Sequence, residues 1–161
     1  MIRRVKIAEF EKGLLLRNGR LVRVLDPGVH WVGGEGVAFD LRRRDTEVDA
    51  APVLTREAVP VGVRLQIAYR VNDPAAAFLA VYDYRAQLAN DARSAAHRAV
   101  SRAAVADFGA EHNRLEIEIQ DRLALETAVY GLRVEDVAIV QVRFPRAIRK
   151  KLKRMEVPSI P

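Results

Sequence analysis

The sequence predicts an α+β domain in which helices pack on one side of a mostly antiparallel β-sheet, followed by a short basic C-terminal helix. Turn residues and apolar residues at every second position dominate the first half of the chain, which indicates antiparallel strands. The apolar spacing then changes to three or four residues, which indicates helices, before one more alternating segment and a basic stretch. The 161 residues are enough for one ordinary domain.

A β-hairpin is predicted over Gly13–Leu25, where two apolar runs flank Arg17-Asn18-Gly19-Arg20. The Asn-Gly pair favours the positive φ angles of a two-residue type I′ turn. Asp26-Pro27-Gly28 predicts a second turn, because proline presets one φ angle and glycine adopts a left-handed one freely. The first part of the chain is therefore expected to form closely connected strands.

The glycine-rich segment Gly33-Gly34-Glu35-Gly36 separates two short predicted strands, Val29–Val32 and Val37–Leu41. Glycine-rich loops can bind phosphate groups, but this segment lacks the G-x-G-x-x-G spacing and the Lys-Ser/Thr pair of a P-loop, and no helix clearly follows it. We therefore expect a flexible hairpin tip.

The clearest strand is Val59–Val71, where the alternation has no break. Pro60 has no N–H group to donate, so it belongs near the start of the strand or on an edge. The predicted core face consists of Val59, Val61, Val63, Leu65, Ile67, Tyr69 and Val71.

Asn72-Asp73-Pro74 marks the start of the helical region, with Asp73 as N-cap and Pro74 at the first helical position. A short helix is expected to about Val81, and a longer one over Tyr84–Val105. The longer helix carries a stripe of mostly small residues that allows close approach to a sheet or another helix: Leu88, Ala92, Ala95, Ala99, Ala103 and Ala106.

A third helix is predicted over Arg114–Tyr130. Asn113 and Glu116 have the spacing of a capping box, in which each side chain bonds to the backbone of the other residue. Gly131 fits the C′ position that ends a helix.

The last strand is predicted over Leu132–Phe144 and ends at Pro145. Strict alternation places one polar residue, Asp136, on the face that is otherwise apolar. The apolar members of this predicted core face are Leu132, Val134, Ala138, Val140, Val142 and Phe144.

The net charge of +6 is concentrated at the C-terminus. Residues 145–154 contain six basic and no acidic residues, which leaves 21 basic and 21 acidic residues elsewhere. The chain has no cysteine, which excludes disulfides, thiolate catalysis and cysteine-ligated metals. No apolar run is long enough for a transmembrane helix and no signal peptide is evident, so we expect a chain that neither spans a membrane nor is secreted.

Four segments together resemble the SPFH domain of the stomatin/prohibitin/flotillin superfamily, also called PHB or Band 7, and are most similar to its stomatin-like (slipin) branch. They are "GLLLRNGRLVRVLDPGVHWV", "VGVRLQIAYRVNDPAAAF" with the "VYDY" that follows, the alanine-rich helix, and "GLRVEDVAIVQVRFP". The resemblance extends from about Val5 to Pro145. It depends on the shared order and spacing of the segments, since none of them is decisive alone.

The resemblance implies an SPFH domain over residues 1–145, with a first β subdomain over 1–50 and an α/β subdomain over 51–145. Residues 146–161 would be a basic helix or the start of a truncated coiled coil. The sequence lacks the family's usual N-terminal membrane-embedded segment and its long C-terminal coiled coil. We therefore expect either an isolated domain or a minimal member of the family, without the coiled coil that ring assembly in the family depends on.

Such domains are non-enzymatic scaffolds that assemble into rings or cages and organise membrane microdomains. The resemblance implies a homo-oligomer at the cytoplasmic, inner face of a membrane, bound peripherally to anionic lipids. It also suggests a membrane protease or an NfeD-type membrane protein as partner. We expect no cofactor, no metal site and no catalytic residue.

Two segments are candidate membrane contacts. In the resembling family the first β subdomain faces the bilayer, so Trp31 and Val32, with the tip up to Val37, form the first candidate. The alternative for a sole tryptophan is a place in the core. The second candidate is the C-terminal helix with Arg149, Lys150, Lys151, Lys153 and Arg154.

Within that helix Ile148, Leu152 and Met155 have amphipathic spacing, as in helices that lie on anionic lipid. The alternative is the first turns of a coiled coil with a solvated cationic face. Arg42-Arg43-Arg44 could add to a basic surface, although a solvated strand end is the simpler interpretation.

Other chemistry has little support. His30, His97 and His112 are interpreted as surface or hydrogen-bonded histidines, and Ser94, Ser101 and Ser159 lack a nucleophile-elbow motif. Nucleic-acid binding through the basic segment is the alternative function, since lysine and arginine alone can neutralise phosphates. It is disfavoured because no aromatic residue lies among these cations to stack on bases.

Overall fold

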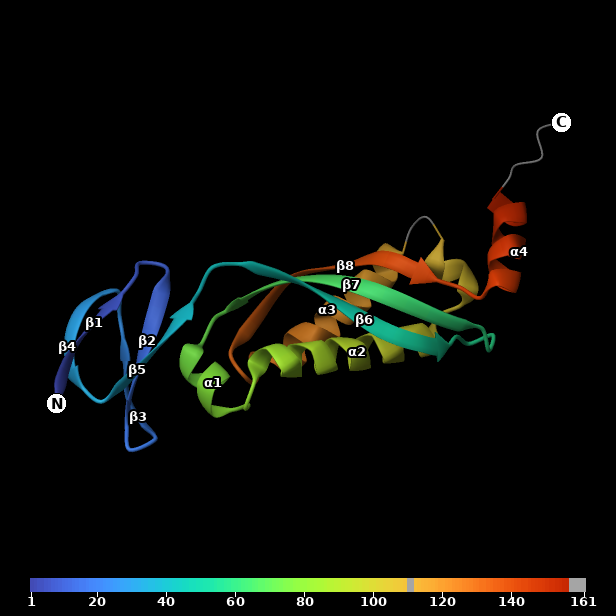
Figure 1. Cartoon of the computed structure of the whole chain (residues 1–161). Helices are drawn as coiled ribbons and strands as arrows, with labels where there is room; N and C mark the ends of the chain where they lie inside the picture. The colour runs from blue at the N-terminus through green and yellow to red at the C-terminus, as the bar shows by residue number, and fades with distance from the viewer. Residues whose placement is uncertain (110–111, 157–161) are drawn as a thin grey trace.

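The computed structural model describes residues 1–109 and 112–156, with side chains of the last helix up to residue 151. The molecule is elongated, with a small β lobe at the N-terminal end and a longer α/β body (Figure 1). The α+β class and the antiparallel pairing are confirmed. The β lobe consists of β1 (Ile2–Ile7), β2 (Glu11–Arg17), β3 (Arg20–Leu25), β4 (Gly28–Gly33) and β5 (Glu35–Asp40).

The β lobe contains two small sheets. β1 pairs with β4 in a two-stranded ribbon, and β2 lies between β3 and β5. The predicted hairpin between β2 and β3 is confirmed, with Asn18 and Gly19 at φ 52° and 74°. Ile7, Leu15, Leu25 and Val32 form the core of the lobe.

The prediction of a flexible hairpin tip at Gly33–Gly36 is wrong. β4 and β5 do not pair with each other, because β4 pairs with β1 and β5 pairs with β2. Gly34 turns the chain between the two sheets at φ 143°, and a Cβ there would overlap the carbonyl oxygen of Leu16. This close approach to β2 explains the need for glycine at that position.

The body contains the third sheet, with the strand order β6-β7-β8, formed by β6 (Arg44–Leu54), β7 (Pro60–Val71) and β8 (Leu132–Arg143). The alternation predicted for β7 is confirmed, and Pro60 lies at its start. The side chains on the inner face of β7, from Val61 to Val71, are all less than 5% exposed. β6 has no counterpart among the predicted strands, because small or charged residues make up much of its length.

The face predicted for β8 is wrong in its middle. Two register shifts against β7 leave Glu135 and Val140 without a cross-strand partner. Each such bulge adds a residue to one strand and exchanges its inward and outward positions. Val137 and Ile139 are therefore buried, whereas Val140 is 47% exposed. The bulge at Glu135 also explains how Asp136 reaches the surface.

Helices cover one face of this sheet (Figure 1). They are α1 (Pro74–Leu79), α2 (Tyr84–Arg102), the 3₁₀ turn η1 (Val105–Phe108) and α3 (Asn113–Ala128). Asp73 caps α1 as predicted, since its carboxylate accepts the N–H of Ala76 at 3.2 Å. The stripe of α2 from Leu88 to Ala103 is buried against the sheet and α3, and only Ala106, beyond the helix end, is exposed.

The predicted capping box of α3 is wrong. His112 is the N-cap residue and Asn113 is the first residue of the helix. The Glu116 carboxylate instead accepts the backbone N–H of Ile139 at 2.9 Å, which ties α3 to β8. Gly131 has the expected positive φ, 74°, two residues beyond the C-cap Val129.

The two parts of the molecule are joined through the end of β5. Phe39 and Leu41 pack against the body core, and the rings of Phe39 and Tyr84 lie 6.3 Å apart. The chain passes from the lobe to the body between Asp40 and Arg44, so residue 50, the expected subdomain boundary, lies inside β6. α4 (Arg146–Glu156) follows β8 and projects from the far end of the body (Figure 1).

Candidate interaction surfaces

The outward face of the β1–β4 ribbon combines apolar and basic side chains. In an antiparallel pair, directly opposed residues share a face. Arg4 lies opposite Trp31 and Lys6 opposite Val29, and all four are exposed. Ile2 lies on the same face, because positions two apart on a strand point the same way.

Trp31 is 70% exposed, Ile2 73% and Val29 48%, so this face is not part of the core. Neither strand of the ribbon contains an aspartate or glutamate. We call Ile2, Arg4, Lys6, Val29 and Trp31 the ribbon face. A tryptophan beside cations and aliphatic side chains suits the boundary between water and anionic lipid.

Val32, the other candidate in this strand, lies on the opposite side of the ribbon. Its side chain is 3% exposed and packs with Ile7, Leu15 and Leu25. The period of two in a strand places neighbouring residues on opposite faces, so Trp31 and Val32 cannot both meet a membrane. Val32 is therefore a core residue and does not belong to the candidate surface.

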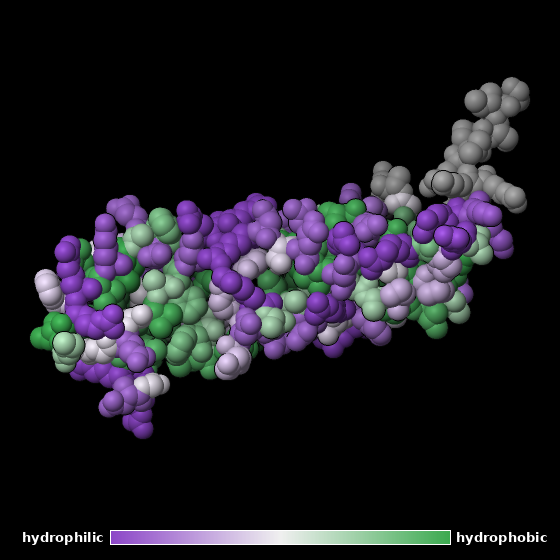
Figure 2. All heavy atoms as spheres, in the orientation of Figure 1, coloured by the Kyte–Doolittle hydropathy of each residue, from purple (hydrophilic) through white to green (hydrophobic). Residues whose placement is uncertain are grey.

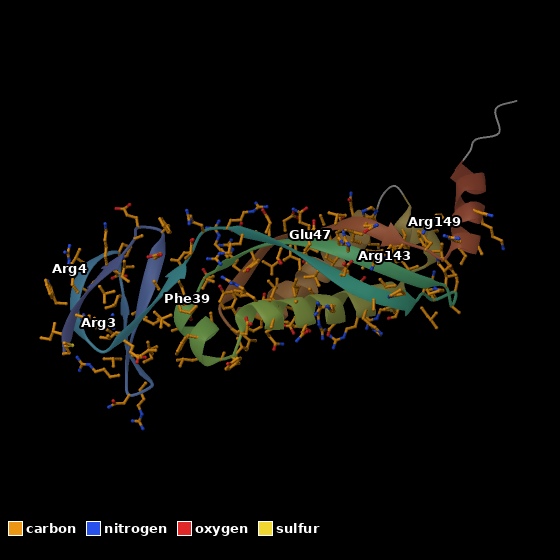
Figure 3. All side chains as sticks on the ribbon, viewed as in Figure 1. Arg3, Arg4, Phe39, Glu47, Arg143 and Arg149 are labelled. Carbon is orange, nitrogen blue, oxygen red and sulfur yellow. The ribbon has the colours of Figure 1, made fainter. Side chains whose placement is uncertain are left out.

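The second candidate surface lies at the opposite end of the molecule. Figure 3 shows Arg149 on α4 at one end and Arg3 and Arg4 of β1 at the other. Arg149, Lys150 and Lys151 are exposed, whereas the side chains of Lys153 and Arg154 lie outside the described residues. The structure does not bring the two candidate surfaces together.

Sequence reasoning missed the basic character of the β lobe. Residues 1–43 contain nine basic and five acidic residues, and residues 44–144 contain 12 basic and 15 acidic residues. The positive charge therefore lies at both ends of the elongated molecule and not only at the C-terminus. A count up to the predicted boundary at residue 50 gives 10 basic and 8 acidic residues, so most of the excess appears only once the end of the lobe is known.

The three histidines make ordinary hydrogen-bonding contacts or face solvent. His30 Nε2 lies 2.6 Å from the carbonyl oxygen of Asp26, and His97 is exposed. His112 lies between the carbonyl oxygens of Gly109 and Ile139, with Glu116 at 3.4 Å. The His112–Glu116 pair was not predicted, although its spacing of four residues is a signal visible in the sequence.

No group of three or more potential metal ligands occurs within the described ranges 1–109 and 112–156. Within the same ranges, no helix is long and apolar enough to cross a bilayer.

The arginines of Arg42-Arg43-Arg44 all have carboxylate neighbours. Arg42 pairs with Asp40 at 2.7 Å, Arg44 lies 3.8 Å from the same carboxylate, and Arg43 lies 3.7 Å from Asp45. Asp40 and Arg44 line a cleft of about 680 Å³ between β5 and the segment around α1. These three arginines therefore pair mainly with carboxylates of their own chain, close to the junction of lobe and body.

We expect Asp40 to titrate well below an ordinary aspartate. The hydrogen bond from the Arg42 side chain lowers the pKa of Asp40 from 3.8 to about 2, assisted by the Arg42 backbone N–H. Because the folded-state pKa is lowered, the pair stabilises the fold above pH 4 or so. That contribution is lost as the pH falls towards 2.

The test is an NMR titration of the Asp40 carboxyl carbon. In Arg42→Ala the pKa should rise towards 3.8, whereas Arg43→Ala, which removes a neighbouring arginine that does not bond to Asp40, should change it little. An unchanged Asp40 pKa in Arg42→Ala would contradict the assignment.

Comparison with known proteins gives a consistent result. The sequence profile of the SPFH domain / Band 7 family matches residues 5–157. The chain is 31% identical over 147 residues to an uncharacterized protein of Archaeoglobus fulgidus, covering 89% of this chain and 59% of that one. It is 25% identical over 151 residues to a stomatin homolog of Pyrococcus horikoshii, covering 92% and 57%.

A third relative gives a similar alignment. Stomatin-3 of Caenorhabditis elegans is 26% identical over 145 residues, covering 87% of this chain and 54% of that protein. The chain thus spans less than three fifths of the length of each of these relatives.

Proposed function

Because the chain belongs to the SPFH domain / Band 7 family, we propose that it is a non-enzymatic scaffold domain that binds the cytoplasmic, inner face of a membrane through its ribbon face. Members of this family are generally membrane-associated scaffolds, which supports the class of function. We propose further that the domain self-assembles and docks or regulates membrane partners, such as proteases or NfeD-type proteins.

The observation that carries the proposal is the exposure of Trp31 beside Arg4. A large aromatic side chain that is 70% exposed loses the hydrophobic free energy that core packing would supply. At a bilayer surface its ring would leave water, and the Arg4 and Lys6 side chains would approach lipid phosphates. Each such cation contributes about 1 kcal/mol near an anionic surface.

The ribbon face is also held rigidly enough to act as one surface. Six registered residue pairs connect β1 with β4, and Val32 and Ile7 anchor the inner side in the lobe core. The lobe is in turn joined to the body through Phe39. Attachment at this end would leave the body and α4 extending away for contacts with other proteins (Figure 1).

Trp31→Ser should reduce binding to anionic vesicles about tenfold, because most of the interfacial contribution of the ring is lost. The measurement is flotation with mixed phosphatidylserine and phosphatidylcholine vesicles at low ionic strength. Tyr82→Ser is the matched control, since Tyr82 is a fully exposed aromatic residue between α1 and α2 and is not part of the ribbon. It should float like the wild type.

Binding should also weaken as salt is added and on pure phosphatidylcholine, because Arg4 and Lys6 contribute electrostatically. Equal flotation of the Trp31→Ser variant and the wild type would refute the ribbon as the lipid-binding surface. If Lys150→Gln/Lys151→Gln abolished flotation instead, the membrane surface would be α4.

A further inference from the structure

The face of the body sheet opposite the helices is open and polar. The rows across it are set by the strand register, in which Asp45, Ala68 and Asp136 are aligned on β6, β7 and β8. The next row contains Glu47, Gln66 and Ala138. Figure 2 shows mostly hydrophilic residues along the upper side of the body, where these strands lie in Figure 1.

These two rows form a shallow acidic trough. The side chains of Ala68 and Ala138 are small and leave a hollow of about 210 Å³ in this face. The hollow is lined by these alanines and by Asp45, Gln66, Asp136 and Arg43. Glu47 is exposed at its edge, on β6 (Figure 3). We call Asp45, Glu47 and Asp136, with the two alanines between them, the trough.

The carboxylates of the trough are poorly neutralised by their own chain. Within the part of the chain that the structure describes, Glu47 and Asp136 form no ion pair within 4.0 Å, and Asp45 has a single one at 3.7 Å. Neighbouring carboxylates on the same face are engaged much more closely. Asp49, for example, binds Arg143 at 2.8 Å and Arg64 at 3.1 Å.

α4 carries the opposite charge to the trough. Arg146, Arg149, Lys150 and Lys151 are exposed, and the helix has no acidic residue before its last position. Among its described side chains, only Arg149 hydrogen-bonds outside the helix, to the carbonyl oxygen of Phe144. The helix projects from the body (Figure 1), and its described cations, up to Lys151, form no ion pair within 4.0 Å.

α4 is badly placed to fill the trough of its own chain. Asp136 lies seven residues before Arg143 on β8, or about 23 Å along the strand. Arg149 to Lys151 lie within about 9 Å of the start of the helix, even if the short Phe144-Pro145 connection reversed its direction. The trough of another copy is under no such restriction.

We propose that α4 of one copy docks in the trough of the next copy, its cations pairing with Asp45, Glu47 and Asp136. The inference rests on the proposed self-assembly and names the two surfaces that carry it. The contact is heterologous, so each copy offers one helix and one trough and the association can propagate or close into a ring. Exposed ion pairs contribute little each, so the contact is weak in dilute solution and sensitive to salt.

The test is a charge swap followed by sedimentation velocity at low ionic strength. Glu47→Lys/Asp136→Lys reverses the trough, and Lys150→Glu/Lys151→Glu reverses the helix. Each double variant alone should associate about tenfold more weakly than the wild type, because attraction becomes repulsion at two positions. An equimolar mixture of the two should associate again, since each reversed surface then meets its complement.

Glu118→Lys/Asp121→Lys is the matched control, because it makes the same change of charge on α3, on the covered side of the sheet. It should associate like the wild type. A wild-type chain that stays monomeric at low salt, a mixture that stays dissociated, or an equal loss in the control would each overturn the proposal.

The experiments distinguish failure of the proposed docking of α4 from failure of the proposed membrane attachment. A monomer that still floats with vesicles through Trp31 overturns only the docking of α4. An oligomer that does not float overturns only the attachment.

Discussion

Gly131→Ala should lower the free energy of unfolding by about 2–5 kcal/mol, the largest effect that we expect from a change of one methyl group. Gly131 has φ 74°, where an alanine costs about 1–2 kcal/mol. Its new Cβ would also overlap the carbonyl oxygen of Asp73 and press on the Cβ of Ala76. Relieving such a clash typically costs about 1–3 kcal/mol.

The backbone around Gly131 has little room to adjust. Its carbonyl oxygen accepts the N–H groups of Asn72 and Asp73, at 2.7 and 2.9 Å. A shift of Gly131 away from Asp73 would weaken the junction between α3, β8 and the capped start of α1. The loss should appear as a lower midpoint of urea unfolding with an unchanged slope.

Gly19→Ala is the matched control for this prediction. Gly19 has the same φ, 74°, but apart from its two chain neighbours no residue lies within 4 Å of the position that a Cβ would take. Its variant should lose only the backbone contribution, about 1–2 kcal/mol. Equal losses in the two variants would show that the contact with Asp73 does not matter.

The second large effect is expected at Ile139. Ile139→Ala should cost about 2–4 kcal/mol, because the side chain is 7% exposed in the body core and its removal leaves a cavity. Val140→Ala should change the free energy of unfolding by less than about 0.5 kcal/mol, since Val140 is 47% exposed.

This pair of neighbours also tests the bulges in β8. An uninterrupted strand would bury Val140 and expose Ile139, so its variants would show the reverse order of stability. Urea unfolding of both variants decides between the two arrangements. A greater loss in Val140→Ala would contradict the register between β7 and β8.

The proposed surfaces occupy separate places on an elongated molecule. The ribbon face lies at the N-terminal end, α4 lies at the far end, and Glu47 of the trough lies on the body sheet between them (Figure 3). Because the surfaces do not overlap, lipid and neighbouring copies can be bound at the same time. Binding to a membrane would also raise the local concentration of the chain, which favours a weak contact such as that of α4 with the trough.

Much of the fold was predictable because its signals are local. The Asn18-Gly19 turn, the Asp73 cap and the alternation of β7 each depend on residues close together in the sequence. The family resemblance rests on the order of such local segments. The basic character of α4 is equally a property of consecutive residues.

The candidate site was only partly predictable. The sequence singled out Trp31 but not its partners, because Ile2, Arg4 and Lys6 are brought beside it by the pairing of β1 with β4, about 25 residues apart in sequence. It also placed Val32 on the same surface, an assignment that required knowing which face of the ribbon is buried. The trough was invisible for the same reason, since its carboxylates come from β6 and β8.

By itself, then, the sequence determined the α+β class, most of the strands and helices, the family and the cationic C-terminal helix, because turn geometry, capping and periodicity act over a few neighbouring residues. Tertiary structure alone decided which sheet each strand of the lobe joined, where the bulges of β8 exchanged inward and outward residues, and which side of the ribbon met solvent. These depend on contacts between segments that are distant in sequence. A bulge or a change of pairing partner leaves only a faint local pattern, yet it determines which side chains reach the surface.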